Sequence, residues 1–201
     1  MRILFVCTGN LCRSPLAEGL ALAWARESLA NSPELAVVDI SSAGLAAVPG
    51  REMDPHAAEA LRRHEAPHPV FRSRPFSSEL AEDADLVFTM TRDQRSAVLR
   101  AVPRGLRRTF TLTEAAALLS HADRTGLALM PLTSRARELG RRLDVARAGR
   151  TTSDQDDTPD PVGKTAAMHD SVAVRVATAL RPLADVLFTS VRSELRTPEP
   201  V

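Results

Sequence analysis

Aromatic residues are the scarcest class in this chain of 201 residues, which has six Phe, one Trp and no Tyr, together 3% of the residues. Hydrophobic residues of all kinds still make up 44%, so a sizeable core can form from aliphatic side chains. A length near 200 residues favours one globular domain. A binding site in this chain therefore has few rings on which a ligand could stack.

The chain also lacks an excess of charge of either sign. Its 26 Lys and Arg residues nearly balance 25 Asp and Glu residues, which gives a formal net charge of +1. Proteins that bind nucleic acid or anionic lipid usually carry a basic patch or run. The Arg-rich stretch at residues 134–150 is interpreted as a solvated helix face, and DNA binding through it is the weakest alternative. We expect no nucleic-acid partner and no membrane partner.

Long apolar runs and a cysteine framework are missing as well. No stretch approaches the roughly 18 apolar residues that span a bilayer, and the apolar start of the chain ends at Thr8 and Gly9, too early for a signal-peptide core. Cys7 and Cys12 are the only cysteines, too few for a zinc site with four thiolates. These features favour a cytoplasmic protein with reduced thiols.

What is present is an alternation of strand and helix patterns. Residues 2–7 form a continuous apolar, β-branched run typical of a buried parallel strand. Further strands are predicted at residues 36–41, 86–90 and 107–110. Such alternation predicts an α/β fold with a parallel sheet and helices on both of its faces.

Helix-start signals follow the strands. Ser14 before Pro15 has the pattern of an N-cap residue and a proline at the first helical position, and Asp54-Pro55 marks the start of a second helix. Two further starts have the spacing of capping boxes: Thr91 with Gln94, and Thr111 with Glu114.

Residues 121–157 interrupt this pattern, and we predict that they form a surface insertion with an Arg-rich helix over 134–148. The helical pattern returns after Thr165 and continues beyond Pro182. Residues 1–190 are therefore predicted to form a single domain, and residues 191–201 a frayed C-terminal tail.

The loop between the first strand and the first helix, Cys7-Thr8-Gly9-Asn10-Leu11-Cys12-Arg13-Ser14, is called the cradle below. A loop in this position turns backbone N–H groups inward and, with the helix dipole, binds an anion. Gly9 and Asn10 tolerate the left-handed conformations that such a loop needs. The sequence therefore predicts a phosphate-binding loop.

Side chains of the cradle add chemistry to this binding. Arg13 can donate two hydrogen bonds to a tetrahedral oxyanion. The positive field of the cradle favours a thiolate at Cys7, which can attack a bound phosphoryl group. The Ser14 hydroxyl could stabilise that thiolate.

Attack on a phosphate ester also needs an acid that protonates the leaving oxygen, and the same group can then activate water. Four aspartates near the C-terminus are candidates: Asp154, Asp156, Asp157 and Asp160. Most of these carboxylates are expected to be solvated linker residues. Asp160 is followed by Pro161, which stiffens the loop.

Together these residues resemble the low-molecular-weight protein tyrosine phosphatase family, over most of the chain outside residues 121–157 and the tail. Five motifs carry the resemblance: VCTGNLCRSP at the N-terminus, SSAG, DPHAAEAL, DADLVFTMT and PDPVG. The resemblance implies a three-layer, flavodoxin-like fold with a four-stranded parallel sheet. It also implies a cysteinyl-phosphate intermediate, no metal and no cofactor. The expected substrates are phosphorylated proteins, phosphotyrosine among them, or small phosphomonoesters.

The resemblance further assigns the catalytic roles. Cys7 would be the nucleophile, Arg13 would bind the phosphoryl oxygens, and Asp160 would be the general acid and then the general base. The cradle residues that would surround the phosphate are Thr8, Gly9, Asn10, Leu11, Cys12, Arg13 and Ser14.

Supporting roles follow from the same resemblance. Ser14 would assist the thiolate, and Asn10 would hold the loop shape with Ser42 as a supporting partner. Cys12 could trap oxidised Cys7 as a reversible disulfide.

The sequence departs from the family pattern around the substrate entrance. Residues 45–48, Leu-Ala-Ala-Val, and Val162-Gly163 stand where many relatives carry aromatic residues, so a phenyl ring would lose stacking of about 0.5 to 1.5 kcal/mol per aromatic pair. Phe71 and Thr91 replace a supporting His and Asp. Leu11 favours the ester-hydrolysing branch, because the arginine phosphatase branch has Thr there.

Two alternatives remain open from the sequence. One is an arsenate reductase that uses a low-molecular-weight thiol, because arsenate fits the same loop. The other is a non-catalytic phosphate-binding module, against which the full set of Cys7, Arg13 and Asp160 argues.

Overall fold

The computed structural model describes residues 1–66 and 70–189. The predicted tail, residues 191–201, lies outside the described residues.

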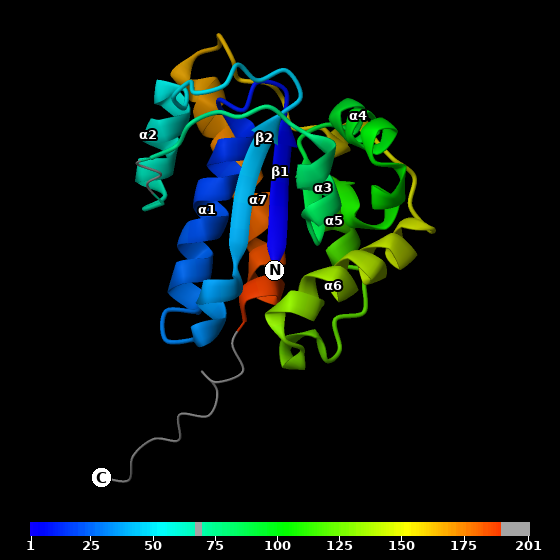
Figure 1. Ribbon diagram of the computed structural model, residues 1–201. Helices are drawn as coiled ribbons and strands as arrows, with labels where there is room; N and C mark the ends of the chain where they lie inside the picture. The colour runs from blue at the N-terminus through cyan, green and yellow to red at the C-terminus, as the bar shows by residue number, and fades with distance from the viewer. Residues whose placement is uncertain (67–69, 190–201) are drawn as a thin grey trace, which may run out of the picture.

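A four-stranded parallel sheet forms the centre of the molecule, as predicted (Figure 1). Its strands are β1 (Arg2–Cys7), β2 (Asp39–Gly44), β3 (Leu86–Thr89) and β4 (Thr109–Thr111), in the spatial order β2-β1-β3-β4. β1 is thus an inner strand, which explains its continuous apolar run. Because the strands are parallel, their carboxyl ends meet at one edge of the sheet, at the top of Figure 1.

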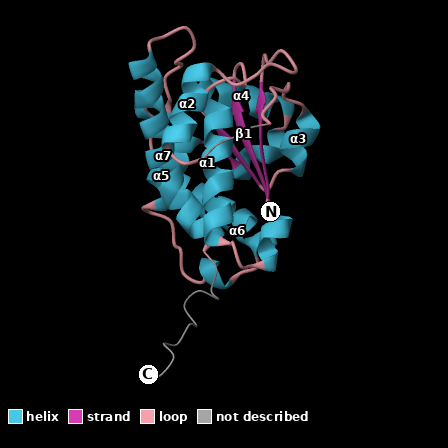
Figure 2. Ribbon diagram, turned by 90° about the vertical axis from the view of Figure 1, so that its left-hand side faces the viewer, coloured by secondary structure: helices cyan, strands magenta, loops and turns pink. Residues whose placement is uncertain are grey.

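Helices cover both faces of the sheet, as predicted (Figure 2). They are α1 (Arg13–Ser28), α2 (Pro55–Arg63), α3 (Ser78–Asp83), α4 (Arg92–Ala101), α5 (Leu112–Leu119), α6 (Leu132–Arg147) and α7 (Ala166–Phe188). Ile3 and Phe5 of β1 share the larger core with α1, α5, α6 and α7, whereas Leu4 and Val6 pack with α3 and α4 on the other face. None of the helices in the described part of the chain combines the length and the apolarity needed to cross a bilayer.

The second strand lies three residues later than residues 36–41, where it was predicted. Residues 33–37 form a short 3-10 helix instead, begun by Pro33 and capped by the Ser32 hydroxyl. The strand then runs through Gly44, because the small Ser-Ser-Ala-Gly segment pairs with the end of β1, with Cys7 opposite Gly44. Ser41 and Ser42 therefore lie inside the sheet.

The predicted helix starts at Asp54 and at both capping boxes are confirmed. The prediction that Ser14 caps the first helix is wrong. α1 begins at Arg13, its N-cap residue is Cys12, and no side chain caps it. Ser14 lies inside the first turn, where its hydroxyl has other partners in the cradle.

The predicted surface insertion contains a helix that enters the core. The apolar side of α6 is buried against the sheet through Leu132, Ala136, Leu139 and Leu143. Arg135 is buried on the same side and donates to backbone carbonyl oxygens, among them those of Leu187 and Thr189 at the end of α7. Other arginines of α6 pair with Glu138 and Glu114, which leaves less positive charge for a nucleic acid. The limits of the domain stay a prediction.

Candidate active site

The cradle connects β1 directly to α1 at the carboxyl edge of the sheet. Cys7 is buried, and its sulfur has two polar neighbours. The Ser14 hydroxyl oxygen lies 2.9 Å from Sγ, and the backbone N–H of Asn10 donates to Sγ over 3.3 Å. Asn10 has a φ of 53°, the left-handed conformation predicted for this loop. Donors placed in this way stabilise negative charge on the sulfur.

The Asn10 side chain holds the loop in shape. Its amide nitrogen donates to the hydroxyl oxygens of Ser14, over 3.0 Å, and of Ser42, over 2.7 Å. Its amide oxygen accepts from the backbone N–H of Arg74 over 2.9 Å. Ser42 in turn donates to the carboxylate of Glu18 over 2.5 Å. Asn10 and Ser42 are thus hydrogen-bonded to each other, and Glu18 and Arg74 belong to the same network.

Gly44 lets the end of β2 lie directly against the cradle. A Cβ atom on this residue would lie 2.7 Å from the carbonyl oxygen of Thr8 and 2.8 Å from the backbone nitrogen of Asn10. Both are backbone atoms that a side-chain rotation cannot move, so only glycine fits here.

Gln94 is a cradle contact that the sequence analysis did not assign. Its side-chain nitrogen donates to the Thr8 hydroxyl over 3.0 Å, and its side-chain oxygen accepts from the backbone N–H groups of Met90 and Thr91. The capping box of Thr91 and Gln94 was the feature of the sequence that could have indicated this contact. In a capping box the Gln94 side chain is held at the start of the helix. Gln94 therefore links the end of β3 to the cradle.

Arg13 reaches from the first turn of α1 to the loop that contains Asp160. Its side chain is 4% exposed, its Nη1 donates to the carbonyl oxygen of Thr158 over 3.0 Å, and its Nη2 forms an ion pair with Asp160. Its Nε is buried without a hydrogen-bond partner among the described residues. A buried donor without a partner costs free energy. An additional acceptor, such as an oxyanion oxygen, would be stabilised here.

The other candidate acids have partners away from Arg13. Asp154 and Asp157 pair with Arg92, and Asp156 pairs with Arg150. Burial alone would raise the pKa of Asp156, but hydrogen bonds from Arg150 and from a backbone N–H hold it below its usual value. These three carboxylates are thus engaged with arginines other than Arg13.

The loop that carries Asp160 is tied to the sheet. The backbone N–H of Thr158 donates to the carbonyl oxygen of Met90 over 2.7 Å, directly after β3. Asp160 itself is about half exposed, so its carboxylate can meet a substrate that enters from solvent.

Cys12 lies in the same loop but in different surroundings from Cys7. Burial, with a further contribution from the Asp54 carboxylate, raises the pKa of its thiol to about 12. This shift favours the neutral thiol form of Cys12. Both cysteines are free, and the disulfide expected between them stays a prediction.

Two aliphatic segments lie at the same edge of the molecule as the cradle (Figure 1). They are residues 45–48, which follow β2, and the segment around Val162, which precedes α7. Val48 and Val162 are more than half exposed. The walls that a substrate would meet on these segments are therefore aliphatic.

Comparison with known proteins agrees with this geometry. Residues 2–123 match the model of the family described as low molecular weight phosphotyrosine protein phosphatase. A protein-arginine-phosphatase of Bacillus subtilis (strain 168) is 42% identical over 115 residues, which are 57% of this chain and 71% of that protein. The low molecular weight protein-tyrosine-phosphatase PtpB of Staphylococcus haemolyticus (strain JCSC1435) is 38% identical over 91 residues, 45% of this chain and 57% of that protein.

Solved structures extend the similarity beyond the region that the family model matches. A crystal structure of a YwlE mutant from Bacillus subtilis has a TM-score of 0.65 and 30% identity, covering 93% of this chain and 98% of that chain. Another structure, of a YwlE arginine phosphatase mutant with a phosphorylated active-site serine, has a TM-score of 0.66 and 29% identity, covering 96% and 99%. The chain belongs to the low molecular weight phosphotyrosine protein phosphatase family.

Proposed function

We propose that this protein is a cysteine-dependent phosphatase in which Cys7 attacks phosphorus and Asp160 transfers the protons. The observation that carries the proposal is the Cys7 sulfur in contact with Ser14 and the Asn10 N–H, on a loop whose Arg13 also holds Asp160. The proposed substrates are phosphorylated proteins or small phosphomonoesters, and the proposed compartment is the cytoplasm.

The reaction has two steps. The Cys7 thiolate forms a bond to phosphorus while the bond from phosphorus to the leaving oxygen breaks, and Asp160 gives its proton to that oxygen. Water then attacks the cysteinyl phosphate, the Asp160 carboxylate takes a proton from the water, and the bond between phosphorus and sulfur breaks. Phosphate leaves, and both groups return to their starting states.

Arg13 and the cradle N–H groups would hold the three non-bridging oxygens during both steps. The unpartnered Nε of Arg13 supports this role, because it is a buried donor still available to an acceptor. Ser14 would stabilise the thiolate as a leaving group in the second step.

Replacement of Asp160 by Asn tests the proton transfer. We expect the variant to lose about 10²-fold or more in kcat/KM for an alkyl phosphate, whose leaving oxygen needs a proton, and much less for p-nitrophenyl phosphate, whose leaving group is stable as an anion. The measurement is kcat/KM for both esters, because kcat/KM reports the first step and leaves out the hydrolysis of the shared cysteinyl phosphate. Asp154→Asn, the same change at an aspartate paired with Arg92, is the control. Equal losses on both esters would contradict the acid role.

Phosphotyrosine is proposed as the substrate over phosphoarginine because Leu11 occupies the position where the arginine phosphatase branch has Thr. Leu11 is half-buried at the cradle. Its isobutyl group would narrow the space beside the reacting phosphorus without offering a hydrogen bond.

Leu11→Thr tests this assignment. We expect the ratio of kcat/KM for phosphoarginine to kcat/KM for a phosphotyrosine peptide to rise about 10-fold or more, because the change removes bulk and adds a hydroxyl. Leu129→Thr, at an exposed leucine, is the control. A wild-type protein that already prefers phosphoarginine would show that the substrate assignment is wrong, with Cys7 still the nucleophile.

A further inference from the structure

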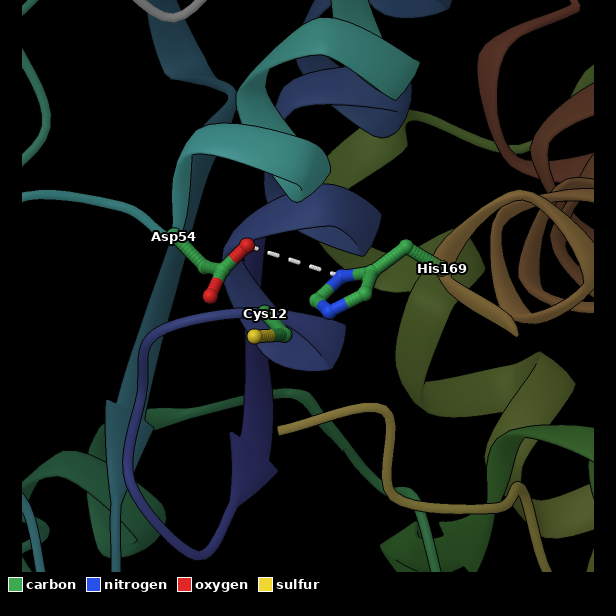
Figure 3. Close-up of side chains that lie close together, drawn as sticks. All are labelled: Cys12, Asp54 and His169. Carbon is green, nitrogen blue, oxygen red and sulfur yellow. Dashed lines mark ion pairs between the residues drawn. The ribbon is translucent and has the colours of Figure 1, made fainter. Parts of the chain in front are cut away.

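Three potential metal ligands meet at the cradle, one of which, Cys12, belongs to the cradle itself (Figure 3). Cys12 precedes α1, Asp54 precedes α2, and His169 lies near the start of α7. One ligand atom of each residue lies within 4.8 Å of the other two. Figure 3 shows the three side chains pointing toward one another from three different segments.

The cluster is buried. Cys12 and His169 are each 3% exposed, and Asp54 is partly buried. The Nδ1 atom of His169 lies 3.6 Å from Oδ1 of Asp54, which is too long for a hydrogen bond. The contact between His169 and Asp54 is thus an ion pair rather than a hydrogen bond, and the ring of His56 lies 5.1 Å from that of His169.

The Asp54 carboxylate is already oriented by the backbone. Its Oδ1 atom accepts from the N–H groups of His56 and Ala57, which is how it caps α2. Hydrogen bonds of this kind fix a carboxylate ligand before a metal arrives. The second oxygen, Oδ2, takes no part in that cap.

The donor set identifies the class of ion. A thiolate, an imidazole nitrogen and a carboxylate oxygen together suit Zn²⁺ and similar transition-metal ions, whereas Mg²⁺ and Ca²⁺ prefer oxygen ligands alone. Zinc bonds of about 2.0 to 2.3 Å in a tetrahedron place ligand atoms roughly 3.3 to 3.8 Å apart. The cluster would have to contract by about 1 Å at its widest separation.

We propose that Cys12, Asp54 and His169 form a binding site for a divalent transition-metal ion of the Zn²⁺ type, with water as a fourth ligand. Binding forms a bond from the metal to sulfur, releases the Cys12 thiol proton to solvent and transfers no electron. The expectation that the hydrolysis needs no metal is unaffected, because this ion would not touch the reacting phosphorus.

Metal binding to this cluster would restrain the cradle through Cys12 and through the backbone contact of Asp54. The backbone N–H of Asp54 donates to the carbonyl oxygen of Leu11 over 2.9 Å, so the cluster is coupled to the loop next to Cys12. A bound ion would connect the cradle with α2 and α7 and would keep the Cys12 sulfur from reacting with an oxidised Cys7. That last consequence depends on the proposed function, but binding itself does not.

The test uses Co²⁺, a spectroscopic substitute for Zn²⁺, in the full chain with Cys7→Ser, so that Cys12 is the single thiol. We expect a near-ultraviolet charge-transfer band from thiolate to Co²⁺ and visible bands typical of tetrahedral coordination, both displaced by Zn²⁺ at a 1:1 ratio. A Zn²⁺ concentration 100 times the Kd should raise the ratio of folded to unfolded protein by about 100-fold, measured as a shift in Tm.

Two conservative variants in the same background identify the ligands. His169→Phe keeps a ring in the buried position, and Asp54→Asn keeps a residue that caps helices well. Loss of a hydrogen-bond partner of a metal ligand typically costs about 10- to 100-fold in affinity, so loss of a ligand should cost at least that much. His121→Phe, at a histidine between α5 and α6, should leave the Kd unchanged.

The outcomes separate clearly. A Co²⁺ complex without the sulfur band, or His169→Phe and Asp54→Asn variants that are folded by circular dichroism and bind Zn²⁺ as tightly as the parent, would overturn the proposal. Because every measurement is made with Cys7→Ser protein and needs no turnover, a failure of the proposed phosphatase function leaves the result intact.

Discussion

Replacement of Cys7 by serine is expected to lower the turnover of p-nitrophenyl phosphate by at least about 10⁴-fold, the largest effect expected for any single substitution in this protein. A serine hydroxyl is a far weaker nucleophile than the Cys7 sulfur that the proposed mechanism uses, which contacts Ser14 and the Asn10 N–H. The fold should survive, because serine is smaller than cysteine and can keep both contacts.

Cys12→Ser is the matched control for this result. It makes the same chemical change at the other buried cysteine, whose sulfur has different neighbours. We expect its loss of kcat to be far smaller. Residual turnover of a few per cent in Cys7→Ser protein, with Cys12→Ser equally impaired, would contradict the assignment of Cys7 as the nucleophile.

Arg13→Lys is expected to have the second largest effect, a loss of about 10³-fold in kcat/KM. Lysine keeps the charge but cannot place two parallel N–H groups on two phosphoryl oxygens. It also lacks the second nitrogen with which Arg13 holds Thr158 and Asp160 at the same time. The substitution should therefore impair phosphate binding and the position of the acid together.

The measurement for Arg13→Lys is kcat/KM together with the inhibition constant of inorganic phosphate, which reports binding without chemistry. Both should weaken. Arg142→Lys, at an arginine of α6 that pairs with Glu138, is the control and should change neither. Unchanged phosphate inhibition in Arg13→Lys protein would show that the guanidinium does not bind the oxyanion.

Local patterns in the sequence predicted the part of the site that the chain builds from neighbouring residues. The apolar run of β1, the left-handed Asn10 and the Cys7 to Arg13 spacing lie within twelve residues, so short-range rules decide them. The Ser14 error has the same origin: a serine before a proline resembles a helix cap, but the buried sulfur and amide nearby bind its hydroxyl more favourably.

Contacts between distant segments were not predictable in this way. Gln94 donates to Thr8 because β3 lies beside β1. The carbonyl oxygen of Thr158 accepts from Arg13 because the loop of Thr158 is hydrogen-bonded to Met90. The Cys12, Asp54 and His169 cluster depends on how α2 and α7 pack against α1. Such contacts follow from the three-dimensional arrangement of the elements, which periodicity and spacing do not specify.

In the proposed site, the ion pair between Arg13 and Asp160 would favour strongly charged ligands. The Asp160 carboxylate is already paired with the Arg13 guanidinium. An incoming anion therefore has to replace this carboxylate before it can bind Arg13. Chloride or a carboxylate of a metabolite brings one diffuse charge and gains little, whereas a doubly charged tetrahedral phosphate can use Nε, both Nη atoms and the loop N–H groups together. The same exchange would free the Asp160 side chain from Arg13, beside the leaving oxygen of the proposed reaction.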